Sequence, residues 1–196
     1  EKLCENRDWT QIVLLTDRMD YVAAATNNLG YCETVEKLMQ LEVPRRAELI
    51  RVIASELNRV SSHLVWFGAF LLDLGGFTPL LYAFDDREKI LDLLEAVTGA
   101  RLTYSYFRIG GVRDDVDDAF LKGTGEFVKF MGPRLAMYQE LVTDNIILRK
   151  RLEGIGALSA DMCRKYGATG PVIRGSNVPY DVRRAEPYSV YPELDF

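Results

Sequence analysis

The amino-acid sequence predicts a mainly α-helical protein, a helical bundle with short strands at its periphery. Apolar residues recur at helical spacing over long stretches, most clearly in the residues that follow Pro44. Glycine and proline fall mainly where these stretches stop, as expected at helix ends. With 48% apolar and 27% charged residues, the chain can bury a core, and we expect a single domain over residues 1–196.

Apolar spacing predicts the first two helices. Residues 11–15 look like a short extended segment, and the apolar positions behind them predict a helix over residues 17–40. Pro44 suits the first turn of a second helix, which should hold about 30 residues and end at Gly75-Gly76. The second face of this helix carries Trp66 and Phe70 among polar residues, so neighbours should cover the helix on more than one side.

Shorter elements should follow the long helix. Residues 85–88 resemble a capping box that opens a helix as far as Gly99. Residues 102–106 alternate in polarity as a short strand does. Beyond this strand we expect two helical stretches broken at Gly132-Pro133 and near Asp144, a short helix over residues 159–166, and irregular or extended chain from Gly170 onward.

Composition excludes several classes of protein. The formal net charge of −5, without a long Lys or Arg cluster, argues against a nucleic-acid-binding protein. The longest apolar run, from Leu64 to Leu72, is far shorter than the ~20 residues that span a bilayer. Three dispersed cysteines favour a reducing compartment. The chain begins without Met and shows no targeting signal, so we expect a fragment of a longer chain.

The residues that could carry chemistry are few. The sequence holds no GxGxxG or Walker-type loop. Its single histidine, His63, excludes most catalytic triads and multi-histidine zinc sites. An iron–sulfur cluster usually needs four thiolates, and three dispersed cysteines cannot supply them. Composition and spacing alone therefore predict only a helical domain.

For three polar residues the sequence allows either a structural or a functional role. Asp73 should end the long helix, where the helix dipole disfavours an anion, within an apolar stretch. It needs a structural partner, such as an arginine or a backbone donor, or it takes part in proton chemistry. Tyr21 should lie one turn inside the first helix, where a tyrosine usually packs. His63 is most often a core or boundary histidine, with catalysis as the alternative.

Six stretches of the sequence together resemble one known family, the D-type core subunit that lines the quinone site of respiratory complex I, the NADH:quinone oxidoreductase. The resemblance extends over nearly all 196 residues, and its motifs are specific. These stretches are Asp17-Arg18-Met19-Asp20-Tyr21, Pro44-Arg45-Arg46-Ala47, Glu56-Leu57-Asn58-Arg59, Leu72-Asp73-Leu74-Gly75, Arg108-Ile109-Gly110-Gly111-Val112 and Tyr180-Asp181-Val182-Arg183-Arg184.

The resemblance implies the fold of the nickel–iron hydrogenase large subunit, to which this family is related. Hydrogenases carry a CxxC pair just after an arginine that corresponds to Arg18. The two thiolate positions here are Asp20 and Ala23, and neither is a soft ligand for nickel. We therefore expect no metal bound by this chain and an organic redox molecule in place of the former metal.

The resemblance also implies two site residues. Family members use the tyrosine that matches Tyr21 to donate a hydrogen bond to the quinone headgroup, a role that suits a phenol. Asp73 matches the aspartate that interacts with a histidine from an upstream strand. That histidine is absent from these 196 residues. The resemblance therefore predicts Tyr21 and Asp73 as catalytic residues of a site that this stretch holds only in part.

One position departs from the family pattern. Many members place a histidine two residues after the arginine of the Gly-Ala-Arg motif, where its protonation follows reduction of the terminal iron–sulfur cluster. Thr103 stands at this position, and threonine does not titrate. The substrate quinone could be of the menaquinone or ubiquinone type, and Thr103 favours a low-potential acceptor such as menaquinone. The cluster itself belongs to a small partner subunit.

The resemblance predicts a core subunit that forms the quinone-reduction site of a proton-pumping complex. Its partners would be the small iron–sulfur subunit and the membrane arm, with NAD bound elsewhere in the complex. It would lie peripherally on the cytoplasmic side of a bacterial or archaeal membrane, or on the matrix side in mitochondria. The alternative is a catalytically silent assembly scaffold of a related ferredoxin- or deazaflavin-dependent complex.

Overall fold

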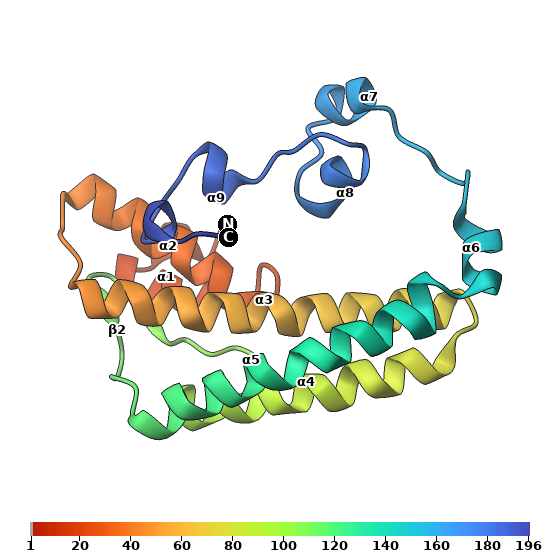
Figure 1. The fold of residues 1–196 in the computed structure, drawn as a ribbon. Helices are drawn as coiled ribbons and strands as arrows, with labels where there is room; N and C mark the ends of the chain where they lie inside the picture. The colour runs from red at the N-terminus through yellow and green to blue at the C-terminus, as the bar shows by residue number, and fades with distance from the viewer. Residues whose placement is uncertain (1) are drawn as a thin grey trace. The chain divides into compact units, whose positions relative to one another are not determined.

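The computed structural model describes residues 2–196, and the chain divides into two compact units. The first unit extends to Val142 and the second covers Thr143–Phe196 (Figure 1). The first unit holds α1 (Trp9–Thr16), α2 (Ala24–Met39), α3 (Arg45–Asp73), α4 (Phe77–Thr98), β1 (Phe107–Arg108), β2 (Gly111–Val112) and α5 (Asp118–Tyr138), after a short 3-10 turn at Cys4–Asn6. The mainly α-helical class with short peripheral strands is confirmed.

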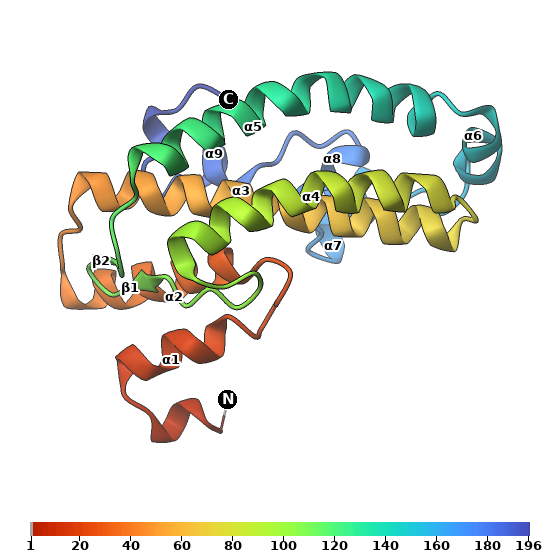
Figure 2. The same ribbon diagram turned by 90° about the horizontal axis from the view of Figure 1, so that it is seen from below.

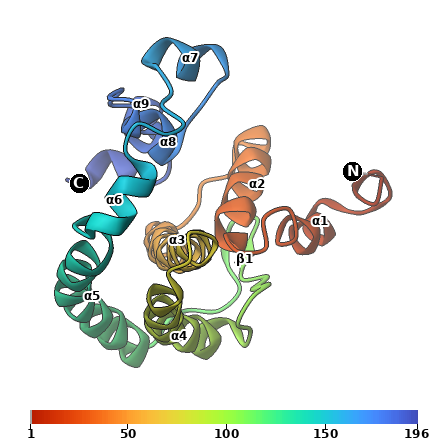
Figure 3. The ribbon, with the colours of Figure 1, turned by 90° about the vertical axis from the view of Figure 1, so that its right-hand side faces the viewer.

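The centre of the first unit is the hairpin of α3 and α4, along which α5 runs (Figure 2). The two helices of the hairpin approach closely at Gly68, because a Cβ there would lie only 3.2 Å from the Cα of Leu80. Gly123 of α5 faces the Leu93 side chain of α4, since its Cβ would lie 2.7 Å from Leu93 Cδ2. Seen along the bundle, α2 packs against α3 and α1 packs outside α2 (Figure 3).

A buried ion pair joins α2, α3 and the β-hairpin. Arg51 Nη2 lies 2.6 Å from Glu36 Oε1, and Nη1 lies 3.0 Å from Oε2. The same guanidinium donates to the carbonyl oxygens of Arg108 and Gly111, and Glu36 accepts from the Gly110 N–H at 2.7 Å. Because Arg51 is 1% exposed, these five groups satisfy one another out of water. The pair therefore fixes the hairpin against the helices.

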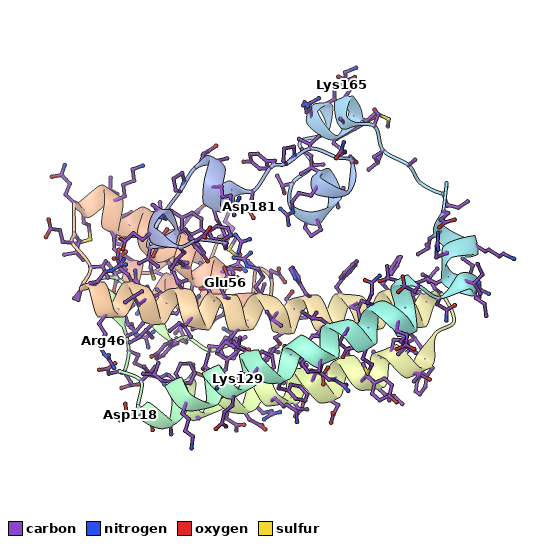
Figure 4. The ribbon with its side chains drawn as sticks, viewed as in Figure 1. Arg46, Glu56, Asp118, Lys129, Lys165 and Asp181 are labelled. Atoms are coloured by element: carbon purple, nitrogen blue, oxygen red, sulfur yellow. The ribbon has the colours of Figure 1, made fainter. Side chains whose placement is uncertain are left out.

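Surface ion pairs also connect elements that are distant in sequence. Arg46, near the start of α3, lies 2.8 Å from Asp115 in the segment that leads into α5. Figure 4 labels Arg46 and also Asp118 in the first turn of α5. Both partners of the Arg46–Asp115 pair are more than half exposed, so the pair contributes little stability.

The structure corrects the predicted start of the chain. Residues 11–15 belong to helix α1, not to a strand, because a short apolar run does not distinguish the two by period. The Asp8 backbone N–H donates to Gln11 Oε1, as at a capped helix start. The predicted helix over residues 17–40 is half right. Residues 17–23 form an irregular turn, and helix α2 begins only at Ala24.

Three further boundaries differ from prediction. Helix α4 begins at Phe77, before the predicted capping box, because Pro79 is tolerated in a first turn. The strand predicted at residues 102–106 lies slightly later, where Phe107 pairs with Val112 and Arg108 with Gly111 in an antiparallel hairpin. Helix α5 continues through Pro133 and ends in a π-helical turn at Gln139–Thr143.

The second unit consists of short helices. It holds α6 (Ile146–Leu152), α7 (Ala160–Lys165), α8 (Gly170–Gly175), α9 (Val182–Ala185) and a 3-10 turn at Tyr191–Glu193. The short helix predicted near residues 159–166 is confirmed, with the Ser159 side chain accepting from the Met162 N–H. The expected irregular tail is only partly irregular, since α8 and α9 lie within it.

Candidate functional site

Tyr21 lies in the turn of residues 17–23 that connects α1 to α2, and it is 61% exposed. The prediction that it packs inside a helix is therefore wrong. An exposed phenol keeps its hydroxyl free to meet a molecule from outside the chain, and it can donate or accept a hydrogen bond. The neighbouring Met19 is also exposed and adds apolar surface to the same turn.

A buried carboxylate holds the start of this turn. Asp17 is fully buried, and its Oδ2 accepts from the Ser105 N–H at 2.9 Å. Burial raises the pKa of the Asp17 carboxyl, and the hydrogen bond from Ser105 opposes that rise. Asn28 of α2 secures the helix that precedes the turn, because its Nδ2 donates to Val13 O at 3.0 Å and to Thr16 Oγ1 at 2.8 Å.

A buried amide holds the end of the turn. Asn58 Oδ1, in the middle of α3, accepts from the Ala25 N–H at 3.0 Å. Asn58 Nδ2 donates to the Val22 carbonyl oxygen at 3.2 Å and to the Tyr104 hydroxyl at 3.4 Å. Asn58 is 1% exposed, so water does not compete for these bonds. We call Asp17, Asn28 and Asn58 the polar clamp of the turn.

Sequence reasoning missed the clamp as a functional feature. Two of its members, Asp17 and Asn58, lie within stretches that carry the family resemblance, yet the motifs alone give neither of them a role. A signal was available, because Asn58 falls on the apolar stripe of α3 between Leu57 and Ser61. An asparagine on a buried helix face needs hydrogen-bond partners, and buried polar groups are nearly always satisfied. The partners themselves could not be read from the sequence.

Asp73 is the last residue of α3 and is exposed. One of the two predictions for Asp73 was a structural partner such as an arginine. An exposed carboxylate is solvated by water and does not need such a partner. Asp73 lies fifteen residues beyond Asn58, or about 22 Å along the helix axis at 1.5 Å per residue. Asn58, in the middle of α3, bonds to the backbone of Val22, the residue after Tyr21. Tyr21 therefore lies beside the middle of α3, well apart from Asp73 at the end of this helix.

Asp20 and Ala23, which the resemblance aligns with the hydrogenase thiolates, are bonded to each other through the backbone of the turn. The Ala23 N–H donates to the Asp20 carbonyl oxygen at 3.0 Å. Within residues 2–196, no group of three or more His, Cys, Asp or Glu side chains could hold a metal ion. Burial raises the pKa of the Cys32 thiol to about 11, so this cysteine stays protonated and is a poor ligand for a cluster.

A second carboxyl lies beside the buried ion pair. Burial raises the pKa of Glu33 to about 7, against the favourable effect of Arg51, and the neighbouring Glu36 and Glu48 add to the rise. The folded protein therefore binds this proton more tightly than the unfolded chain does. Protonated Glu33 therefore makes its full contribution to the stability of the fold below pH 4.5, the pKa of the unfolded chain. This contribution is lost as the pH rises through about 7, the pKa in the folded protein.

We expect Glu33→Gln to remove this pH dependence. The variant should gain stability over the unchanged protein as the pH rises from 4.5 to about 7, by at most ~3 kcal/mol. Thermal unfolding of both proteins across this range measures the difference. The exposed Glu126→Gln serves as the control, and parallel pH profiles for Glu33→Gln and the unchanged protein would contradict the prediction.

Comparison with known proteins places the chain in a family. The family described as "Respiratory-chain NADH dehydrogenase, 49 Kd subunit" matches residues 73–196. A D-type subunit of NADH-quinone oxidoreductase from Opitutus terrae is 67% identical over 196 residues, which are 100% of this chain and 49% of that protein. The D-type subunit of the same enzyme from Desulfotalea psychrophila is 60% identical and is covered to 53%. The chain thus spans about half the length of these relatives.

A solved structure agrees in fold. The chain superimposes on a chain of the membrane-bound sulfane sulfur reductase, an archaeal respiratory membrane complex, with a TM-score of 0.96 and 36% identity. The match covers 100% of this chain and 53% of the other. Within residues 2–196, no helix is long and apolar enough to cross a membrane. Sequence and fold together show that the chain belongs to the family of the 49 kDa, or D-type, subunit of respiratory-chain NADH dehydrogenase.

Proposed function

We propose that this chain forms the quinone-reduction site of a proton-pumping NADH:quinone oxidoreductase, as the central part of a longer core subunit. The observation that carries the proposal is the exposed Tyr21 on a turn that buried residues hold at both ends. A phenol carried by a backbone held in this way can donate a hydrogen bond to a quinone oxygen. The 67% identity to the Opitutus terrae NADH-quinone oxidoreductase subunit supports the assignment.

The reaction adds two electrons and two protons to the quinone. Electrons would arrive from an iron–sulfur cluster in a small partner subunit, since the cysteines of this chain are too dispersed to hold one. Tyr21 would orient the headgroup and supply a proton to the reduced oxygen. Asp73 would stabilise the protonated form of a histidine outside these residues. The quinone would be of the menaquinone or ubiquinone type, with Thr103 favouring menaquinone.

The family resemblance also suggests the setting of the subunit. The subunit would join the other subunits of the complex, including the membrane arm, and NAD would bind elsewhere. It would lie peripherally on the cytoplasmic side of the membrane, or on the matrix side in mitochondria. A silent assembly scaffold is the less favoured alternative, because a purely structural pocket would need neither the Tyr21 hydroxyl nor the Asp73 carboxylate.

Acceptor specificity tests the proposal. The purified complex that contains this subunit should transfer electrons from NADH to a soluble quinone analogue, and a quinone-site inhibitor should block this reaction. Reduction of hexacyanoferrate, an artificial acceptor, should persist with the inhibitor present. Reduction of polysulfide without reduction of quinone would overturn the proposal, and would instead agree with the sulfane sulfur reductase that shares the fold.

The role proposed for Asp73 predicts a separate result. Asp73→Asn keeps the size of the side chain and removes its charge. We expect quinone reduction by the assembled complex to fall about tenfold, because a hydrogen bond to a charged group is worth ~1.5 kcal/mol or more. Assembly should be retained, because Asp73 is exposed in this chain.

The exposed Asp118→Asn, in the first turn of α5, provides the control and should change neither rate nor assembly. Assembled Asp73→Asn complex with full quinone reduction and full proton pumping would show that Asp73 lies outside the reaction.

A further inference from the structure

We propose that Asn58 is a positioning residue for Tyr21 in quinone reduction. The inference rests on the proposed function and adds to it the residue that sets where the Tyr21 hydroxyl lies. Asn58 itself is buried in the middle of α3 and meets no substrate. It would act only through the backbone of the turn that carries Tyr21.

The geometry of the Asn58 amide supports this role. The carboxamide uses both of its ends on the same short piece of chain, accepting from the Ala25 N–H and donating to the Val22 carbonyl. Val22 directly follows Tyr21 in sequence, so Asn58 holds the backbone immediately next to the reacting side chain. The uncharged carboxamide offers an acceptor and a donor in one plane. Asn58 therefore fixes both the position and the direction of the turn.

Because Tyr21 is exposed, the position of its side chain depends on the bonds that hold its backbone. A buried tyrosine is held by its neighbours, whereas a side chain that is 61% exposed depends on its own backbone for its position. The turn is bonded to the rest of the unit at Asp17, at Val22 and, through a longer bond of 3.4 Å from Asn27 Nδ2, at the Asp20 carbonyl oxygen. A shift of the turn by about 1 Å would misplace the hydroxyl, and errors of this size cost ~100-fold in rate.

A purely structural role is the competing explanation, and a double-mutant cycle separates the two. Asn58→Ala, Tyr21→Phe and the combined variant are compared with the unchanged subunit in the assembled complex. The kcat and KM for a soluble quinone analogue are measured, together with hexacyanoferrate reduction. If Asn58 acts through the Tyr21 hydroxyl, removing that hydroxyl first leaves Asn58→Ala with little further effect.

The expected results are specific. Asn58→Ala alone should lower kcat/KM for the quinone about 10- to 100-fold and leave hexacyanoferrate reduction unchanged. In the Tyr21→Phe background the same substitution should cost less than about twofold. Ser61→Ala is the matched control, since Ser61 is fully buried one turn further along α3 and, within residues 2–196, its hydroxyl has no hydrogen-bond partner. It should change the rate less than about twofold.

A second variant keeps the test decisive if Asn58→Ala fails to assemble. Asn58→Ser places no charge at this buried position and keeps a hydroxyl that can accept or donate, but it is too short to bond to both Ala25 and Val22, and it should fold with an intermediate loss of rate. Equal losses from substitution of Asn58 with and without the Tyr21 hydroxyl would overturn the inference alone. Full activity of Tyr21→Phe would overturn the proposed role of Tyr21 itself, and this inference with it.

Discussion

Replacing Tyr21 with phenylalanine in the assembled complex should lower quinone reduction about 5- to 150-fold. The substitution keeps the ring and removes only the hydroxyl, and an unsatisfied partner left in a closed site costs ~1–3 kcal/mol. Folding should be unaffected, because the side chain is 61% exposed and the bonds of the polar clamp do not involve it. Rates with a soluble quinone analogue, measured with NADH as donor, give the result.

Two comparisons make this result interpretable. Electron transfer to hexacyanoferrate should continue at the normal rate, since it does not require the quinone site. Tyr166→Phe removes a hydroxyl from an even more exposed tyrosine of the second unit, and it should leave both rates unchanged. If Tyr21→Phe behaves like Tyr166→Phe, Tyr21 has no part in the chemistry.

The largest loss of stability is expected from Glu36→Gln. The substitution leaves the Arg51 guanidinium buried at 1% exposure without its carboxylate, and a broken buried pair costs ~3–5 kcal/mol. This cost is a large share of the ~5–15 kcal/mol that typically stabilises a domain. Urea unfolding of the purified protein, followed by far-ultraviolet circular dichroism, should show a strongly reduced midpoint or no folded baseline.

The surface pair of Arg46 and Asp115 supplies the contrast. It has a similar N–O distance, 2.8 Å, but both side chains are largely exposed, so Arg46→Ala should cost no more than ~1 kcal/mol. Burial, and not the distance alone, would then explain the difference. If Glu36→Gln and Arg46→Ala lowered the free energy of unfolding by similar amounts, burial would not explain the contribution of the Glu36–Arg51 pair.

The sequence by itself determined the helical class, the course of the long helix and the family. Apolar spacing over α3 is a local property, and Pro44 with Gly75-Gly76 marks its ends to within a residue or two. The short helix predicted from residue 159 was equally local, and in the structure the Ser159 side chain caps it. Tyr21 and Asp73 were predicted from motif resemblance, and their roles remain predictions.

Only the tertiary structure decided how the candidate site is held. The turn of residues 17–23 is not a helix because its ends bond to groups elsewhere in the chain, and the helical period of the sequence gives no sign of this. Asn58 reaches Ala25 across 33 positions, and Ser105 reaches Asp17 across 88. The Glu36 carboxylate meets the Gly110 N–H across 74 positions. Such bonds form only after helices and hairpin pack, because chain closure must first be offset by burial of the surrounding apolar surface.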